Sequence, residues 1–182
     1  MKTELDELLQ RASEATSDIG GHLRYMHDVC IEVDALQVIE LGVRSGLSTI
    51  AFLAAMEKTG GAVWSCDIDR PHVSPPITGH PRWTFVWGDD MEVVDEAPEC
   101  DVLFIDTSHA YLHTVAELNA YSPKVAKVIL LHDTQLESPG GCGPQPPFPV
   151  RKAALEWHAD HPEWTWEEFE HCYGLGVFRR TL

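Results

Sequence analysis

The chain has 182 residues, which is enough for one domain with a single hydrophobic core. Thirteen Lys and Arg stand against 29 Asp and Glu, so the formal net charge is −16. Such a charge disfavours binding to nucleic acids and to anionic membranes, because both need cationic side chains. With 44% apolar residues, the chain is also too hydrophobic for disorder.

The expected compartment follows from what the sequence lacks. The first residues are acidic and have no apolar signal-peptide core. No apolar run approaches the roughly 20 residues that span a bilayer. Five cysteines are scattered along the chain without a C-x-x-C pair, which favours free thiols in a reducing compartment. We therefore expect a cytoplasmic protein.

The apolar residues alternate between helical and strand-like periods, which is typical of an α/β domain. Two helical stretches fill residues 1–34, and we expect them to form part of the cover of the binding site. Residues 35–182 are expected to form the main part of one globular unit. The predicted strands are 37–41, 62–67, 83–87, 101–106, 127–132, 164–169 and 175–180, with helices at 48–58, 91–96, 110–121 and 150–160. A Pro/Gly segment at 135–149 is interpreted as an active-site flap.

Ligands of parallel sheets bind at the carboxyl ends of the strands. After the first predicted strand, residues 40–49 read E-L-G-V-R-S-G-L-S-T. Gly42 and Gly46 allow a sharp turn and a close approach of a ligand, and the next helix begins where an anionic group binds well. Glu40 would repel a pyrophosphate, which argues against an NAD-dependent dehydrogenase. The alternative is a tight turn in which Glu40 caps only local groups.

The next two predicted strands also end in acids. Asp67 and Asp69 follow the second strand, at a place where a carboxylate can accept hydrogen bonds from a ribose diol. Asp89 and Asp90 follow the third strand, directly after Gly88. Either pair could instead be a helix N-cap or a solvated turn.

The fourth and fifth predicted strands end in Asp106 and in His132 and Asp133, and His109 follows at the start of a helix. Two strand-end aspartates can hold a hard cation such as Mg²⁺, which lowers the pKa of a coordinated hydroxyl. A histidine ligand would favour Mn²⁺, Fe²⁺ or Zn²⁺. His109 is placed to accept a proton. The alternatives are that Asp106 only caps a helix and that His132 is structural. His109 and His113 form an H-x-x-x-H pattern, in which we expect one histidine to point inward and the other outward.

Together these motifs, with I-L-L-H-D-T at 129–134 and G-L-G-V-F at 174–178, resemble class I S-adenosylmethionine (SAM)-dependent methyltransferases. The resemblance is to the small-molecule O-methyltransferase branch with macrolide-sugar and rhamnosyl methyltransferases and cephalosporin-hydroxylase-like proteins. It implies a doubly wound, mostly parallel seven-stranded sheet with helices on both faces and the last strand antiparallel. It also implies O-methyl transfer from SAM to a small hydroxylated acceptor, such as a sugar or polyketide. The sequence is compatible with a homodimer and leaves the oligomeric state open. The alternative function is a methyltransferase-fold binding module without catalysis.

The resemblance also implies roles for individual residues. The glycines would cradle the methionine part of SAM with Glu40 near its ammonium group, Asp67 would bind the ribose and Asp89 the adenine, with Asp69 and Asp90 as adjacent alternatives. The implied cofactor-binding residues are Glu40, Gly42, Arg44, Ser45, Gly46, Ser48, Asp67, Ile68, Gly88, Asp89 and Asp106. The implied catalytic residues are His109 as base and Asp106; the implied ligands of Mg²⁺ or another divalent metal are Asp106, His132 and Asp133. Relatives carry an acid in place of His132, so the metal is left open.

Overall fold

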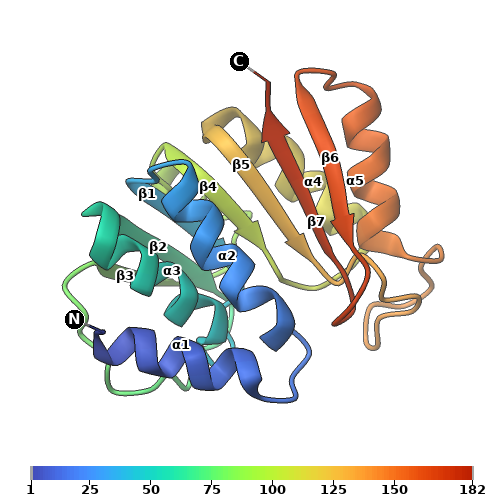
Figure 1. Cartoon of the computed structure of the whole chain (residues 1–182). Helices are drawn as coiled ribbons and strands as arrows, with labels where there is room; N and C mark the ends of the chain where they lie inside the picture. Colours follow the sequence, from blue (N-terminus) through green and yellow to red (C-terminus); the bar gives the residue numbers. More distant parts are fainter. Residues whose placement is uncertain (1, 182) are drawn as a thin grey trace.

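Seven strands form one sheet in the order β3-β2-β1-β4-β5-β7-β6 in the computed structural model, which describes residues 2–181 (Figure 1). The strands are β1 (Gln37–Leu41), β2 (Ala62–Asp67), β3 (Trp83–Trp87), β4 (Cys100–Ile105), β5 (Val125–His132), β6 (Trp164–Phe169) and β7 (Leu175–Arg180). All pairs from β3 to β5 are parallel, and β7 is antiparallel to both of its neighbours. The predicted fold class, including the antiparallel last strand, is confirmed.

Helices cover both faces of the sheet, also as predicted. The helices are α1 (Glu4–Glu14), α2 (Gly20–Glu32), α3 (Leu47–Thr59), α4 (Tyr111–Tyr121) and α5 (Pro149–Ala159), with short 3-10 turns η1 (Val94–Glu96) and η2 (Ser122–Lys124). The first three pack on one face, and α4 and α5 pack on the other (Figure 1). No helix within residues 2–181 combines the length and the apolar character that crossing a membrane requires.

The central strands are apolar on both sides because each side faces a helical layer. In β4, Phe104 belongs to the core under α1–α3, whereas Leu103 and Ile105 belong to the core under α4 and α5. The tryptophans Trp157 and Trp164 are buried in the second core, as the sequence predicted. These two cores fix the sheet, and the loops at its carboxyl edge are held by it.

The N-terminal helices are part of the same fold rather than a separate unit. Leu5, Leu9 and Leu23 are buried in one core with Phe104. The described residues that line the cleft below all come from residue 42 onward. Residues 1–34 reach its rim through Asp18, which pairs with Arg44 and whose carbonyl contacts His132, and through His22, whose ring packs edge-on against that of His132. Met1 and Leu182 lie outside the described residues.

One predicted helix is mostly a loop. Residues 91–96 contain only the short turn η1, because Asp89 bends the chain there. Its carboxylate accepts a hydrogen bond from the backbone N–H of Met91 (2.9 Å), and its carbonyl accepts one from that of Glu92 (3.0 Å). This Asx-type turn replaces the first turn of a helix.

Candidate active site

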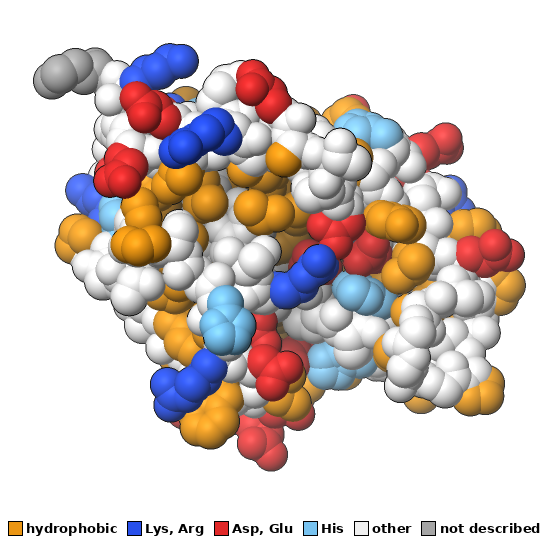
Figure 2. Space-filling view, turned by 90° about the horizontal axis from the view of Figure 1, so that it is seen from below, with side chains coloured by type: hydrophobic (Ala, Val, Ile, Leu, Met, Phe, Trp, Pro, Cys, Tyr) orange, Lys and Arg blue, Asp and Glu red, His pale blue; other side chains and the backbone are white. Residues whose placement is uncertain are grey.

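A cavity of about 360 Å³ opens at the carboxyl edge of the sheet. It lies where the strand order reverses, between β1 and β4, which is the usual ligand site of a doubly wound sheet. The lining residues are Gly42, Val43 and Arg44 after β1; Cys66, Asp67, Ile68 and Asp69 around the end of β2; Gly88, Asp89 and Asp90 after β3; and Asp106, Thr107, Ser108, His109 and His113 after β4. Figure 2 shows acidic and histidine side chains gathered in the hollow on this face.

The turn after β1 is shaped by its neighbouring strands. Gly42 has φ +89°, and its N–H donates to the carbonyl of Cys66 (2.9 Å). A Cβ at this position would lie 2.0 Å from the carbonyl oxygen of Asp106. Glycine is therefore required here by the close approach of β4.

The second glycine of the motif does not face the cavity. Gly46 begins α3 with φ +77°, and a Cβ there would meet Val73 and Ile77 at 2.8 and 2.9 Å. A loop that returns from later in the chain fills the space beside Gly46. Ser45 and Ser48 also lie outside the lining of the cavity formed by the described residues. Gly46 therefore packs against this loop, and its predicted role in holding a ligand stays a prediction.

Glu40 is fully buried behind the same turn. Its carboxylate accepts hydrogen bonds from the hydroxyls of Ser48 (2.6 Å), Thr49 (2.9 Å) and Ser65 (2.5 Å). Burial raises the pKa of Glu40 to about 7, although the three hydroxyls oppose this shift. Among the described residues, Glu40 is not part of the cavity lining. The arrangement matches the alternative in which Glu40 caps local groups, and it tethers β1 to α3 and β2.

The buried Glu40 gives a testable pH dependence. Its pKa is 4.5 in the unfolded chain and about 7 in the fold, so the folded state binds the proton more tightly and loses stability as pH rises between these values. We expect Glu40→Gln to remove this loss, which amounts to about 3 kcal/mol. Urea unfolding of both proteins at pH 4.5, 5.5 and 7 measures it. A wild-type minus variant difference that stays constant with pH would contradict the assignment.

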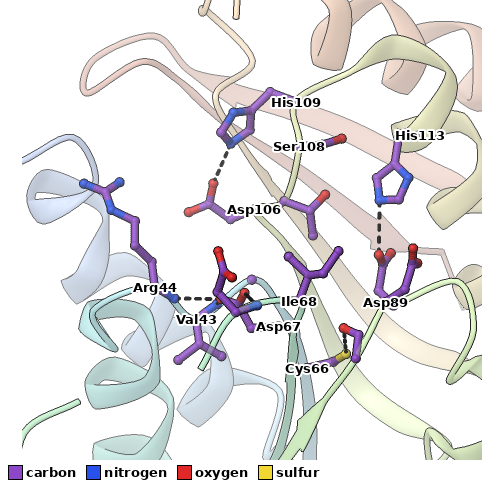
Figure 3. Close-up of a pocket in the computed structure, with 15 residues that line it drawn as sticks. Val43, Arg44, Cys66, Asp67, Ile68, Asp89, Asp106, Ser108, His109 and His113 are labelled. Carbon is purple, nitrogen blue, oxygen red and sulfur yellow. Dashed lines mark hydrogen bonds and ion pairs between the residues drawn. The ribbon is translucent and has the colours of Figure 1, made fainter. Parts of the chain in front are cut away.

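Asp67 holds the loop after β1 against the end of β2. One carboxylate oxygen accepts from the backbone N–H groups of Val43 (2.8 Å) and Arg44 (2.9 Å), and the other accepts from that of Asp69 (2.8 Å). A carboxylate has about four acceptor positions, so about one remains open toward the cavity. Figure 3 shows this carboxylate on the cavity wall beside Val43 and Arg44. Asp67 thus has a structural role that the sequence did not reveal.

Four charged groups converge at the ends of β4 and β5. His109 Nε2 lies 3.0 Å from Asp106 Oδ1 and 2.9 Å from Asp133 Oδ2. His132 Nδ1 lies 3.3 Å from Asp133 Oδ2 and 3.5 Å from Asp106 Oδ1. His109 reaches this position because it stands before α4 in a left-handed conformation, with φ +56°. The structure thus brings together all four residues that the sequence placed at this edge.

The hydrogen bonds of His132 assign its proton. Its Nε2 contacts the carbonyl oxygens of Cys172 (3.1 Å) and Asp18 (3.3 Å), and since carbonyls only accept, Nε2 carries hydrogen. The buried Nδ1 has no hydrogen-bond partner among the described residues. In the protonated ring, Nδ1 lies in ion-pair range of Asp133 (3.3 Å) and Asp106 (3.5 Å), and its lone pair faces the two carboxylates only after that proton is lost. Two carboxylates and a free imidazole nitrogen form a donor set that fits a divalent cation.

The four groups also set each other's charge. Burial alone would lower the pKa of His109 and His132, but the two carboxylates raise both values to about 10. Burial would raise the pKa of Asp106 and Asp133, yet the two imidazoles hold both below the ordinary value. At neutral pH the cluster therefore contains two carboxylates and two imidazolium ions, and a divalent cation could replace two of the protons.

Both histidines of the H-x-x-x-H motif face the cavity, so the expected inward and outward pair is wrong. His109 precedes α4, which begins at Tyr111, and the helical spacing does not apply to it. His113 Nε2 lies 3.2 Å from Asp90 Oδ1, and Figure 3 shows its ring directed toward the acids that follow β3. One oxygen of Asp90 thus pairs with His113, and both Asp89 and Asp90 line the cavity.

The residues implied to bind a cofactor fall into two groups. Those on the cavity wall are Gly42, Arg44, Asp67, Ile68, Gly88, Asp89 and Asp106; those behind it or on its rim are Glu40, Ser45, Gly46 and Ser48. His113, Thr107 and Ser108 also line the cavity, and the sequence did not assign them. Because they follow Asp106 closely in the sequence, their place in the cavity lining could have been predicted.

The doubly wound sheet with one antiparallel strand and an acidic cleft at its switch point defines a class I, Rossmann-like methyltransferase. A family described as "Methyltransferase domain" matches residues 39–134, which is more than half of the chain. The protein belongs to this family of methyltransferases. No curated protein matches the chain.

Solved structures agree with this fold. The O-methyltransferase TomG from Streptomyces achromogenes, involved in tomaymycin synthesis and solved with SAM, has a TM-score of 0.75 at 14% identity, over 100% of this chain and 92% of its own. An O-methyltransferase from Bacillus cereus, in complex with SAH, has a TM-score of 0.70 at 14% identity, over 98% and 89%. The MycE methyltransferase of mycinamycin biosynthesis, with Mg, SAH and mycinamycin VI, has a TM-score of 0.70 at 16% identity, over 99% and 54%.

Proposed function

We propose that the protein transfers a methyl group from SAM to a hydroxyl group of a small molecule such as a sugar or a polyketide. The observation that carries the proposal is the acidic cavity at the ends of β1–β4, which adjoins the cluster of Asp106, His109, His132 and Asp133. The cavity provides a donor site and the cluster provides acid–base groups. The solved neighbours with SAM or SAH support the donor.

The donor side of the cavity suits a ligand with two positive charges. SAM, when bound, supplies a methyl group on a sulfonium centre that an alcohol oxygen can attack in line. The negative lining attracts such a ligand electrostatically. In this proposal Asp67 and Asp69 accept from a ribose diol and Asp89 accepts from the adenine amino group; Asp90, which lines the same wall and pairs with His113 through one oxygen, is the adjacent alternative. Ile68, which is 68% exposed, offers an apolar surface to the base.

The acceptor side lies at the histidine–aspartate cluster. Asp106, Asp133 and His132 Nδ1 would hold a divalent cation, which lowers the pKa of a coordinated hydroxyl. The MycE neighbour, solved with Mg, supports this part of the proposal. His109 keeps its proton while it pairs with both carboxylates. It becomes a base at Nε2 only when those carboxylates are satisfied by another cation.

Binding of the demethylated product SAH tests the donor site. In Asp89→Asn, the backbone N–H of Met91 would retain the amide oxygen, so the amide NH₂ would face the adenine amino group and the hydrogen bond would be lost. We expect SAH to bind at least about tenfold more weakly, which corresponds to about 1.4 kcal/mol. Isothermal titration measures the affinity, and Glu92→Gln, an exposed acid nearby, should leave it unchanged. Absence of SAH binding by the wild type, or equal binding by Asp89→Asn, would refute the donor site.

A further inference from the structure

A second cluster of ionisable side chains lies on the same cleft and has no part in the proposed transfer. It consists of Asp90, after β3, and of His113 and Glu117, one turn apart on α4. His113 Nε2 lies 3.2 Å from Asp90 Oδ1 and 3.6 Å from Glu117 Oε1. One ligand atom from each of the three residues lies within 4.8 Å of the others.

Both carboxylates of this cluster have an oxygen without a partner. Glu117 is fully buried and Asp90 is 9% exposed, yet Glu117 Oε2 and Asp90 Oδ2 make no hydrogen bond within the described residues. The other oxygen of Glu117, Oε1, accepts a hydrogen bond from the hydroxyl of Thr107 (2.6 Å). Buried polar atoms are almost always paired, so these two oxygens indicate a missing hydrogen-bond donor or cation.

The surrounding residues supply only one positive charge to the two carboxylates. Among the described residues, His113 is the ion-pair partner of both carboxylates. One imidazolium can balance only one of two buried carboxylates.

We propose that Asp90, His113 and Glu117 bind a divalent transition metal ion, with Zn²⁺ or Mn²⁺ as the fitting class. One imidazole and two carboxylates suit these ions better than they suit Ca²⁺, which prefers oxygen ligands alone. The hydroxyl of Thr107 orients Glu117 in the way that outer partners orient metal ligands. Asp90 and His113 line the cavity, so an ion can reach the site from the cleft.

This site is separate from the Asp106–Asp133 cluster and would have a different role. It joins the loop after β3 to α4, directly beside Asp89 on the cavity wall. A bound ion would therefore fix the wall of the donor site, and it would bind whether or not the protein transfers methyl groups. The competing arrangement is one proton shared between Asp90 and Glu117.

The test uses the full chain with Asp133→Asn, which disables the first cluster. After treatment with EDTA and its removal, this protein is titrated with Zn²⁺ alone in a calorimeter, and the melting temperature is followed with and without Zn²⁺. We expect Zn²⁺ binding and a higher melting temperature with Zn²⁺. Adding Glu117→Gln should weaken binding at least tenfold and abolish the rise, whereas adding Glu92→Gln should change neither.

Two results would overturn the proposal. The first is equal Zn²⁺ affinity with and without Glu117→Gln. The second is no Zn²⁺ binding by Asp133→Asn, which would mean that Asp90 and Glu117 share a proton instead of binding a metal ion. If the Glu117→Gln protein does not fold, His113→Gln gives the same comparison, because His113 is on the cavity wall and its side chain is 27% exposed. Retained Zn²⁺ affinity in the His113→Gln protein would likewise exclude the site.

Discussion

Replacing Asp133 by Asn is expected to lower the rate of methyl transfer by about 10³-fold while SAH affinity stays within about threefold. Asp133 contacts both His109 (2.9 Å) and His132 (3.3 Å), but among the described residues it is not part of the cavity lining. The variant leaves two imidazoles facing one carboxylate. It therefore removes a cation ligand and releases His109 from its position, without touching the donor site.

Steady-state kinetics with a hydroxylated acceptor, together with SAH calorimetry, checks this expectation. An interaction needed only for the chemical step should lower kcat, not raise KM for SAM. Asp95→Asn, on the exposed turn η1, is the control for a lost surface charge. Because an unpaired buried charge costs about 3 kcal/mol or more, rates must be measured well below the melting temperature of the variant. Unchanged kcat in Asp133→Asn would exclude the cluster from catalysis.

Much of the fold could be predicted because its strands are short apolar runs that end in charged or small residues. The predicted strands 164–169 and 175–180, which also contain charged residues, match β6 and β7 without a shift. The acids at the strand ends could be predicted as well, since parallel strands bring their carboxyl ends to one edge. This logic brought Asp67, Asp89 and Asp106 to one cavity.

The details that could not be predicted depend on partners far away in the sequence. Nothing near Gly46 indicates that Val73 and Ile77 fill the space beside it. In the same way, Glu40 reads as a charged residue near a ligand, but Ser65, from the next strand, completes its burial. A helical spacing for His109 also fails, because the helix begins two residues later, at Tyr111. In each case a tertiary contact decides the role of a residue whose type alone allows several.

The second large effect is expected from Gly42→Ala, which tests whether β1 and β4 meet as closely as the structure shows. A left-handed alanine alone costs about 1 to 2 kcal/mol, and Gly60→Ala measures that cost, because Gly60 has φ +85° with no atom within 4 Å of an added Cβ. At Gly42 the Cβ would lie 2.0 Å from the carbonyl oxygen of Asp106, so backbone must move. We expect Gly42→Ala to lose about 4 kcal/mol of unfolding free energy, measured by urea unfolding.

Gly42→Ala should also lose SAH binding, since the movement displaces Asp106 from the cavity wall. If Gly42→Ala is no less stable than Gly60→Ala, the two strand ends are farther apart than described, and the proposed donor site loses the turn on which it is built.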